Sequence, residues 1–394
     1  MNMRFARRME KIRASETREI LKITERPEVI SFAGGLPAPE MFPVEEMKQV
    51  AVRVLEEEGK KALQYATTEG FVPLREKIAE RLNSKFKTCL ETENILITNG
   101  SQQGLDFSGK VFLDEEDVVL CESPTYLAAI NAFKAYMPRF VEVPSDENGM
   151  IIEELEQRIK EYDKVKLIYV IPDFQNPSGV SWSMERRVKF MELVTKYEIP
   201  VLEDNPYGEL RFEGDMLPAL KSMDEKGLVI LLGTFSKTFC PGLRIGWVAA
   251  EKEILAKYIL VKQGADLHSS TFDQRIIAKY MEDYDLDENV EKIKRVYKVR
   301  RDLMLQTMKE EFPGGIRYTY PQGGLFTWVV LPETINAREV LAKCLDNNVA
   351  FVPGGAFFPN GEHENTFRMN YSNMDEDRIV EGIKRLAEVL REFV

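Results

Sequence analysis

The segment that decides the fold runs from Leu228 to Val248 and reads LVILLGTFSKTFCPGLRIGWV. It opens with an apolar run of strand length, and small and hydroxylated residues then lead to Lys237. Arg244 follows seven residues later, at the start of a second apolar run. A lysine at the end of a buried strand can be desolvated, which lowers its pKa and frees the amine as a nucleophile.

The residues around Lys237 suggest what this amine would meet. The neighbouring hydroxyl groups and Arg244 suit a phosphate. An amine beside a phosphate site is what a pyridoxal phosphate site requires. A lone lysine is more often solvated, so this interpretation depends on whether the rest of the chain supplies the other cofactor contacts.

Composition and charge limit the function classes. The chain has 394 residues, 44% of them hydrophobic and 30% charged, and a net charge of −12. Such a chain can bury a large core, and its acidic balance disfavours nucleic-acid binding. The longest apolar runs have strand length, so we expect no membrane helix. The dinucleotide and P-loop glycine motifs do not occur in the sequence, which disfavours those two classes.

The N-terminus and the cysteines bear on location. The stretch Met1–Lys22 is rich in arginine but also carries glutamates, which transit peptides avoid, so we expect a folded helix there. The four cysteines are far apart and form no Cys-x-x-Cys motif. With only two histidines, the sequence predicts a cytoplasmic protein without a metal site.

Strand-like and helix-like segments alternate through the middle of the chain, which predicts an α/β fold with a mostly parallel sheet flanked by helices. The expected strands are 95–98, 118–121, 167–171, 200–203, 229–232 and 245–249, and the expected helices are 104–112, 127–135 and 184–197. In such sheets ligands bind at the carboxyl ends of the strands.

The pattern changes near Asp285. A long charged helix over 286–309, two strands over 316–320 and 324–331, and an amphipathic helix over 375–393 predict a smaller α+β domain. We therefore divide the chain into an N-terminal segment belonging to this smaller domain (1–45), a large cofactor-binding domain (46–284) and a C-terminal small domain (285–394).

Polar residues follow the first two of these strands. Ser101 and Gln102 follow the strand that ends at Thr98 and open a helix, where free N–H groups and the helix dipole attract an anion. The alternative is that Ser101 only caps the helix. Tyr126 lies where an aromatic ring can stack on a flat cofactor, although it can equally pack at a strand end.

Two later strands end in the same way. Asn176 lies in an Asn-Pro-x-Gly turn and can donate a hydrogen bond to the phenolic oxygen of the cofactor, a role that Tyr207 can share. Asp204 places a carboxylate at the end of a buried strand, where a protonated pyridine nitrogen would be its partner. Its alternative role is a helix cap.

The ordered set of motifs resembles the fold type I pyridoxal phosphate aminotransferases of class I and II. The motifs are Gly-Ser-Gln-Gln (100–103), Ser-Pro-Thr-Tyr (123–126), Gln-Asn-Pro-Ser-Gly (175–179), Glu-Asp-Asn-Pro-Tyr (203–207), Ser-Lys-Thr (236–238) and Pro-Gly-Leu-Arg (241–244). The segments 31–39, 63–70, 263–266 and 352–355 are similar to the 2-aminoadipate and aromatic branch, which includes LysN-like and kynurenine aminotransferases.

This resemblance implies a role for each motif. Lys237 would hold the cofactor as a Schiff base, with Asp204 on the ring nitrogen and Tyr126 stacked on the ring. Asn176 and Tyr207 would hold the phenolic oxygen. The phosphate would be bound by Ser101, Gln102, Ser236 and Arg244, and by Tyr65 of a second subunit, which implies a homodimer with shared active sites.

The same resemblance implies substrate contacts. Arg368 would clamp the substrate α-carboxylate, with a backbone N–H of Gly35 beside it; its alternative role is a surface ion pair. A lid helix carrying Ser15 and Arg18 would cover the pocket, where Arg18 can pair with a side-chain carboxylate or lie exposed.

The expected reaction is a ping-pong transamination between an L-amino acid (2-aminoadipate, aromatic or leucine-like) and 2-oxoglutarate. Two alternatives stay open at this point. The same cofactor contacts serve lyases and decarboxylases of this fold. An effector-sensing module of a transcription regulator is also conceivable, although the acidic charge opposes DNA binding.

Overall fold

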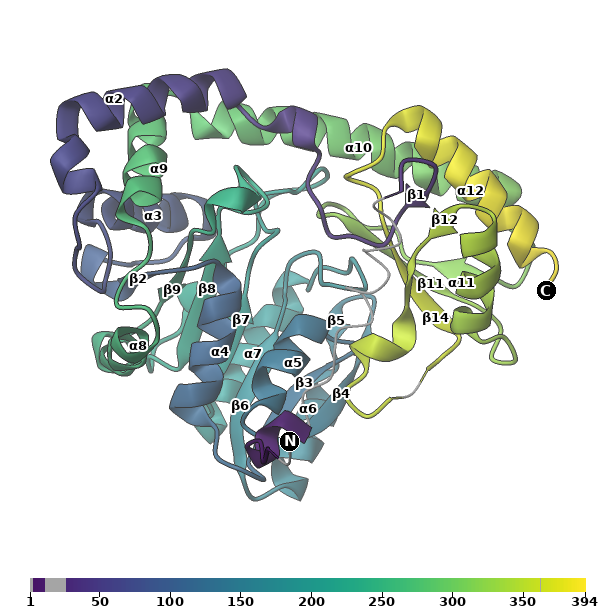
Figure 1. Ribbon diagram of the computed structural model, residues 1–394. Coiled ribbons are helices and arrows are strands. Elements are labelled where there is room, and N and C mark those ends of the chain that lie inside the picture. The colour runs from purple at the N-terminus through teal and green to yellow at the C-terminus, as the bar shows by residue number, and fades with distance from the viewer. Residues whose placement is uncertain (1–2, 11–25, 362) are drawn as a thin grey trace.

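The computed structural model of the protein describes residues 3–10, 26–361 and 363–394. Its strands form an eight-stranded sheet, a four-stranded sheet and one isolated pair. The isolated pair joins β1 (Ile30–Ser31) in parallel to β12 (Val349–Ala350). Figure 1 shows the large sheet below α2 and α9, and the small sheet beside α11 and below α12.

The large sheet has the strand order β2-β9-β8-β7-β6-β3-β4-β5. Strands β3, β4, β6, β7 and β8 pair in parallel, whereas β9 is antiparallel to both β2 and β8, and β5 is antiparallel to β4. The carboxyl ends of β2, β3, β6, β7 and β8 therefore lie at one edge. The strands are β2 (Ile95–Thr98), β3 (Val118–Ser123), β4 (Arg139–Asp146), β5 (Gly149–Met150), β6 (Val165–Val170), β7 (Val201–Asp204), β8 (Val229–Thr234) and β9 (Gly246–Ala249).

Helices cover both faces of this sheet because its strands alternate apolar side chains between the faces. Leu96, Leu202 and Leu232 pack on the face covered by α4, α5 and α8, whereas Ile97 and Leu231 pack toward α2, α3 and α9. The remaining part of that second face meets α6 and α7. These helices are α2 (Val44–Ala62), α3 (Val72–Phe86), α4 (Ser101–Phe112), α5 (Leu127–Lys134), α6 (Ile152–Glu161), α7 (Met184–Tyr197), α8 (Lys252–Ala265) and α9 (Thr271–Asp283).

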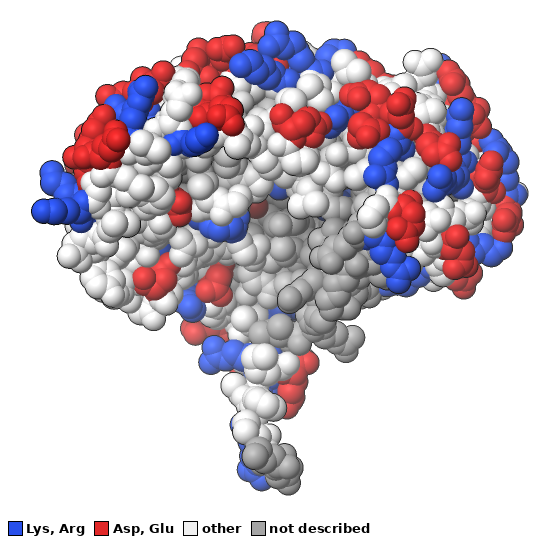
Figure 2. All heavy atoms as spheres, turned by 45° about the horizontal axis from the view of Figure 1, so that its top comes forward, with Lys and Arg blue, Asp and Glu red and all other residues white. Residues whose placement is uncertain are grey.

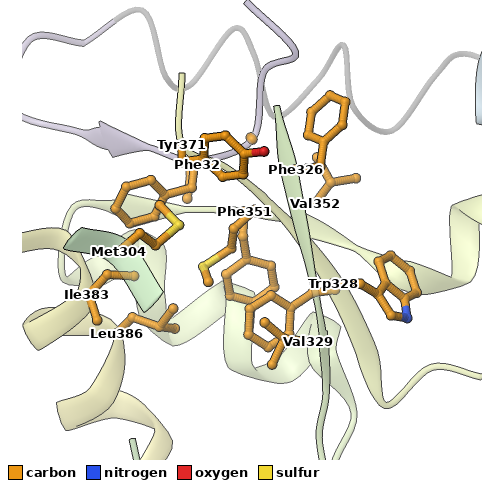
Figure 3. Packing of buried hydrophobic residues seen from close by; sticks show 14 of the residues in the cluster. Phe32, Met304, Phe326, Trp328, Val329, Phe351, Val352, Tyr371, Ile383 and Leu386 are labelled. Atoms are coloured by element: carbon orange, nitrogen blue, oxygen red, sulfur yellow. The ribbon is translucent and has the colours of Figure 1, made fainter. Parts of the chain in front are cut away.

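The small sheet has the order β10-β11-β14-β13 and is antiparallel throughout. Its elements are β10 (Arg317–Tyr318), β11 (Phe326–Val330), β13 (Val352–Pro353), β14 (Thr366–Asn370), α10 (Leu286–Glu311), α11 (Ala337–Asp346) and α12 (Glu376–Leu390). In Figure 3, Met304 of α10 and Ile383 and Leu386 of α12 lie near Phe32, and all four residues belong to one buried cluster. The segment around Phe32 thus packs with the small sheet.

The expected strands and helices are present, with ends that move by a few residues. The helix expected from Gly104 begins at Ser101, and that expected over 286–309 extends to Glu311. The folded helix expected over Met1–Lys22 lies mostly outside the described residues; within it, 7–10 form a single 3-10 turn. The division into domains at residues 45 and 284 stays a prediction.

Charged side chains are mixed over the face shown in Figure 2. Along the upper rim of this view, lysines and arginines (blue) alternate with aspartates and glutamates (red). No helix in residues 3–10, 26–361 and 363–394 is long and apolar enough to cross a membrane.

Candidate active site

A cavity of about 420 Å³ lies where the carboxyl ends of β2, β3, β6, β7 and β8 meet the small sheet. Five loops of the large sheet, the segment after β1 and strand β14 all contribute to it. The residues predicted from sequence that line it are Gly35, Ser101, Gln102, Tyr126, Asn176, Asp204, Tyr207, Ser236, Lys237, Arg244 and Arg368. The topology therefore brings together residues that are scattered along the chain.

Lys237 reaches the cavity from the loop after β8. Its Nζ donates a hydrogen bond of 2.7 Å to the carbonyl oxygen of Gly35. Burial, with the charges of Arg368 and Arg244 nearby, lowers the pKa of the Lys237 amine to about 8. A sizeable fraction of this amine is thus neutral near pH 8, which is the state that a nucleophile or a proton acceptor requires.

Asp204 ends β7, and its carboxylate is buried in the cavity wall with 2% of the residue exposed. The hydroxyl of Tyr169 donates a 2.9 Å hydrogen bond to Oδ2. Oδ1 is buried and has no hydrogen-bond partner among the described residues. Burial raises the pKa of the Asp204 carboxyl to about 7. A buried acceptor without a partner is costly, so Oδ1 suits a ligand that brings its own N–H.

The helix-cap alternative for Asp204 does not hold, because a turn and not a helix follows it, and Asn205 makes the side-chain bond in that turn. Oδ1 of Asn205 accepts a 2.8 Å hydrogen bond from the backbone N–H of Gly208. The other acidic residue of this strand, Glu203, points to the opposite face, where its two oxygens accept the backbone N–H groups of Leu220 and Lys221. Only Asp204 faces the cavity.

The start of α4 forms the anion-binding part of the site. Gly100 is the N-cap residue, with φ +71°, and none of the side chains that the structure describes caps the helix. Ser101 is therefore not the cap, and the first N–H groups of α4 stay available for an anion.

Two residues from the β8–β9 connection complete that part of the site. Nη1 of Arg244 lies 3.4 Å from Oγ of Ser236, which also accepts a 2.9 Å hydrogen bond from Oγ1 of Thr234. Arg244 precedes β9 instead of following a strand. Because β9 is antiparallel to β8, its first residues lie at the same edge as the carboxyl ends of the other strands.

Arg368 reaches the cavity from β14 of the small sheet. Its Nη1 donates to Oδ1 of Asn176 and its Nη2 to the carbonyl of Ala33, both at 2.7 Å. The guanidinium lies over the ring of Phe326, 4.2 Å from its centroid, and Nε has no partner within the described chain. With 3% of the residue exposed, the surface ion-pair alternative does not hold. Burial lowers the pKa of Arg368 to about 10.

Asn176 and Tyr207 meet in the cavity wall. Nδ2 of Asn176 donates a 3.2 Å hydrogen bond to the Tyr207 hydroxyl, and the Tyr207 ring packs edge-on against Phe326 at 5.8 Å between centroids. Tyr126 lines the cavity from the start of α5, and Gln102 from the start of α4. Their expected contacts with a cofactor stay predictions.

Three predicted residues are not in this group. Tyr65 is 78% exposed, does not line the cavity and packs edge-on against His268 with 5.7 Å between ring centroids. Ser15 and Arg18 lie outside the described residues.

Sequence reasoning missed Tyr169 and Thr234 as members of the site. Tyr169 lies inside an apolar strand and Thr234 at the end of another. From the sequence, each therefore looks like a residue that packs within the sheet. The signal that could have found Tyr169 is its position near the carboxyl end of the strand that Asn176 follows. A hydroxyl group there lies close to the predicted site.

The residues present fit pyridoxal phosphate. A partly neutral amine, a buried carboxylate oxygen without a partner, and an uncapped helix N-terminus beside Arg244 match its aldehyde, its ring nitrogen and its phosphate. Within 3–10, 26–361 and 363–394, no group of three or more His, Cys, Asp or Glu side chains is placed to hold a metal ion.

Comparisons with known proteins place the chain among aminotransferases. The family model for aminotransferase class I and II matches residues 28–386. An aromatic-amino-acid aminotransferase of Thermococcus litoralis is 47% identical over 97% of this chain and 92% of its own length. A 2-aminoadipate transaminase of Thermus thermophilus is 43% identical over 98% and 96%. The crystal structure of a kynurenine aminotransferase of Pyrococcus horikoshii in complex with PMP has a TM-score of 0.95 at 43% identity, covering 99% and 97% of the two chains.

Proposed function

This chain belongs to the aminotransferase class I and II family, and we propose that it moves the amino group of 2-aminoadipate, an aromatic or a leucine-like L-amino acid to 2-oxoglutarate. It is a pyridoxal-phosphate-dependent aminotransferase of fold type I. The choice of amino acid is the proposal. The observation that carries it is that apolar side chains, Leu36, Leu127 and Phe326, line the same cavity as Lys237, Asp204 and Arg368.

When bound, pyridoxal phosphate supplies an electron sink for the charge that develops at the α-carbon of the substrate. Asp204 would hold the ring nitrogen through Oδ1, its free oxygen. Asn176 and Tyr207 would hold the phenolic oxygen, Tyr126 would stack on the ring, and the α4 N-terminus with Gln102, Ser236 and Arg244 would hold the phosphate.

Lys237 is placed to move the proton. We propose that its amine would take the proton from the substrate α-carbon, as a base, and would deliver it to C4′ of the bound cofactor, as an acid. The pKa of about 8 suits both steps, because neither protonation state is costly to reach near neutral pH. Arg368 and the backbone N–H of Gly35 would bind the α-carboxylate throughout, which favours transamination over decarboxylation.

The cavity also supports the proposed range of amino acids. Leu36, Leu127 and Phe326 add apolar surface to its lining, which suits aromatic and leucine-like side chains. An acidic side chain needs a cation, and Arg18 on the expected lid is our candidate, with Ser15 beside it.

Shared active sites in a homodimer form a second part of the proposal. Tyr65 is too exposed to serve the cavity of its own chain, as expected for a residue that completes a partner's phosphate site. Exposed apolar side chains of α2 and the following segment, including Val52, Leu55 and Leu63, support an interface there.

The cytoplasmic location stays a prediction. All four cysteines are free, which is the state expected in a reducing compartment.

A panel of amino donors tests the substrate proposal. Each donor is incubated with the purified holoenzyme and 2-oxoglutarate, and glutamate and the new 2-oxo acid are measured. We expect one glutamate per 2-oxo acid, with the highest kcat/KM for the proposed donors. Release of carbon dioxide or ammonia instead would favour a decarboxylase or lyase. Arg18→Ala should lower kcat/KM for 2-aminoadipate and leave the aromatic donors unaffected.

A further inference from the structure

Tyr169 shares a sheet face with Asp204. The registers of β6 and β7 pair Tyr169 with Leu202 in parallel, and Asp204 follows Leu202 by two residues. Because side chains alternate between the faces of a strand, Tyr169, Leu202 and Asp204 all point toward α4, α5 and α8. The Tyr169 hydroxyl can therefore reach along the face to the carboxylate at the strand end.

The tyrosine is buried in that position. The residue is 1% exposed, and its ring packs edge-on against Phe133 of α5, with 5.8 Å between centroids. Its hydroxyl donates to Oδ2 of Asp204 at 2.9 Å. Burial and the nearby Asp204 charge raise the pKa of Tyr169 well above its usual value, so the hydroxyl keeps its proton and remains a donor.

Within the described residues, the side chain of Asp204 makes this single hydrogen bond. It acts on the carboxylate in two ways. It holds Oδ2 and leaves Oδ1 as the oxygen without a partner, and it favours the charged form against the cost of burial. Without it, the carboxylate would be buried and unpaired on both oxygens.

We propose that Tyr169 is a positioning residue that orients the Asp204 carboxylate and favours its charged form for pairing with the ring nitrogen of the cofactor. The inference rests on the proposed pairing of Asp204 with that nitrogen. The inference goes beyond this pairing because it assigns the residue that prepares the carboxylate to bind the ring nitrogen.

Two probes separate this role from a general packing role. Pyridoxal phosphate carries the ring nitrogen, whereas 1-deaza-pyridoxal phosphate has carbon in its place and cannot pair with Asp204. The dissociation constant of each probe is measured for the cofactor-free, full-length protein by absorbance titration. The variants are Tyr169→Phe, Asp204→Asn and the double variant.

The matched control is Tyr258→Phe. Tyr258 of α8 is also fully buried, and its hydroxyl also makes one side-chain hydrogen bond, to Oγ of Ser108 at 2.7 Å. It does not line the cavity. Thermal unfolding of each variant checks that the fold is kept.

We expect Tyr169→Phe to weaken binding of pyridoxal phosphate about tenfold or more, as for a lost hydrogen bond to a charged group. Binding of the deaza probe should change less than twofold, as should binding of both probes to Tyr258→Phe. In the Asp204→Asn background, Tyr169→Phe should add nothing. Equal weakening of both probes, no weakening of either, or a full effect in the Asp204→Asn background would overturn the proposal.

The same data identify a failure of the underlying assignment. If Asp204→Asn itself weakens both probes equally or neither, then the pairing of Asp204 with the ring nitrogen is wrong, and the role of Tyr169 falls with it. If Asp204→Asn selectively weakens pyridoxal phosphate but Tyr169→Phe does not, only the inference about Tyr169 is wrong.

Discussion

Nη1 of Arg368 donates a 2.7 Å hydrogen bond to Oδ1 of Asn176, whose Nδ2 donates in turn to the hydroxyl of Tyr207. Arg368 belongs to the small sheet, and the other two residues follow strands of the large sheet. One amide therefore joins the proposed site for the substrate carboxylate to the proposed site for the cofactor oxygen. A substitution of Arg368 should thus affect both the binding of the substrate carboxylate and the contacts of the cofactor oxygen.

Arg368→Lys should raise KM for every amino acid by roughly 10- to 100-fold, the range expected for loss of a charged hydrogen bond. A lysine cannot contact Asn176 and Ala33 while also presenting donors to a carboxylate. Steady-state kinetics with several donors measures the effect, with Arg385→Lys on α12, which does not line the cavity, as control. An unchanged KM would show that the carboxylate binds elsewhere.

Lys237→Ala should retain bound cofactor but lose at least about 10²- to 10⁴-fold in turnover, the usual contribution of a positioned acid and base. Borohydride treatment followed by mass spectrometry should find the cofactor attached to this residue in the wild type and to no residue in the variant. Lys257→Ala, on the exposed side of α8, serves as control. Near-normal turnover in Lys237→Ala would contradict the assignment.

Covalent loading of the cofactor-free protein should depend on pH through a pKa near 8. The attacking species is the neutral amine, and the lowered pKa of Lys237 means that this species appears as the pH rises through about 8 instead of the usual 10.4 or so of a lysine. The rate constant should therefore rise between pH 7 and 9 and level off above. Stopped-flow absorbance measures it, with N-acetyl-lysine amide as the reference amine. A rate still rising steeply above pH 10 would exclude the lowered pKa.

Gly246→Ala should weaken both folding and cofactor binding. A Cβ there would lie 2.7 Å from backbone atoms of Gly100, Ser101 and Gly233, so β9 and the start of α4 would have to separate. Overpacking of this kind costs about 1–3 kcal/mol. Gly242→Ala is the matched control in the same segment, since a Cβ there meets nothing within 4 Å. Denaturant unfolding and cofactor titration should show a lower stability and weaker cofactor binding for Gly246→Ala than for Gly242→Ala. Equal values for the two variants would contradict the close approach of β9 to the start of α4.

Mixing two inactive variants should restore activity if active sites are shared. Lys237→Ala keeps Tyr65, and Tyr65→Ala keeps Lys237, so a mixed dimer contains one site with both residues. After the two variants are unfolded and refolded together, activity should approach about a quarter of the wild-type value, because half the dimers are mixed and each has one complete site. No gain over the separate variants would contradict the role of Tyr65, and a monomeric mass by light scattering would contradict the dimer.

Much of the fold could be predicted because its signals are local. The apolar runs that become β6, β7 and β8 are each followed by small or polar residues, so the strand ends were visible at 171, 203 and 232. Strand β4 was missed, since Arg139, Glu142 and Pro144 interrupt its apolar pattern. The ends of helices shifted for a similar reason: Ser101 to Gln103 are polar, yet they form the first turn of α4.

The chemistry predicted for each cavity loop came from the ordered set of motifs, because a lysine, an aspartate or an asparagine at the end of a buried strand has other roles when it is taken alone. The alternation of strands and helices also placed most of those ends at one edge. Only the tertiary structure decided which side chains meet. Arg244 joins the site because β9 runs antiparallel, Tyr169 meets Asp204 because of the register between β6 and β7, and Arg368 meets Asn176 because two sheets pack together. Strand direction, register and packing depend on contacts between distant segments, which no local pattern encodes.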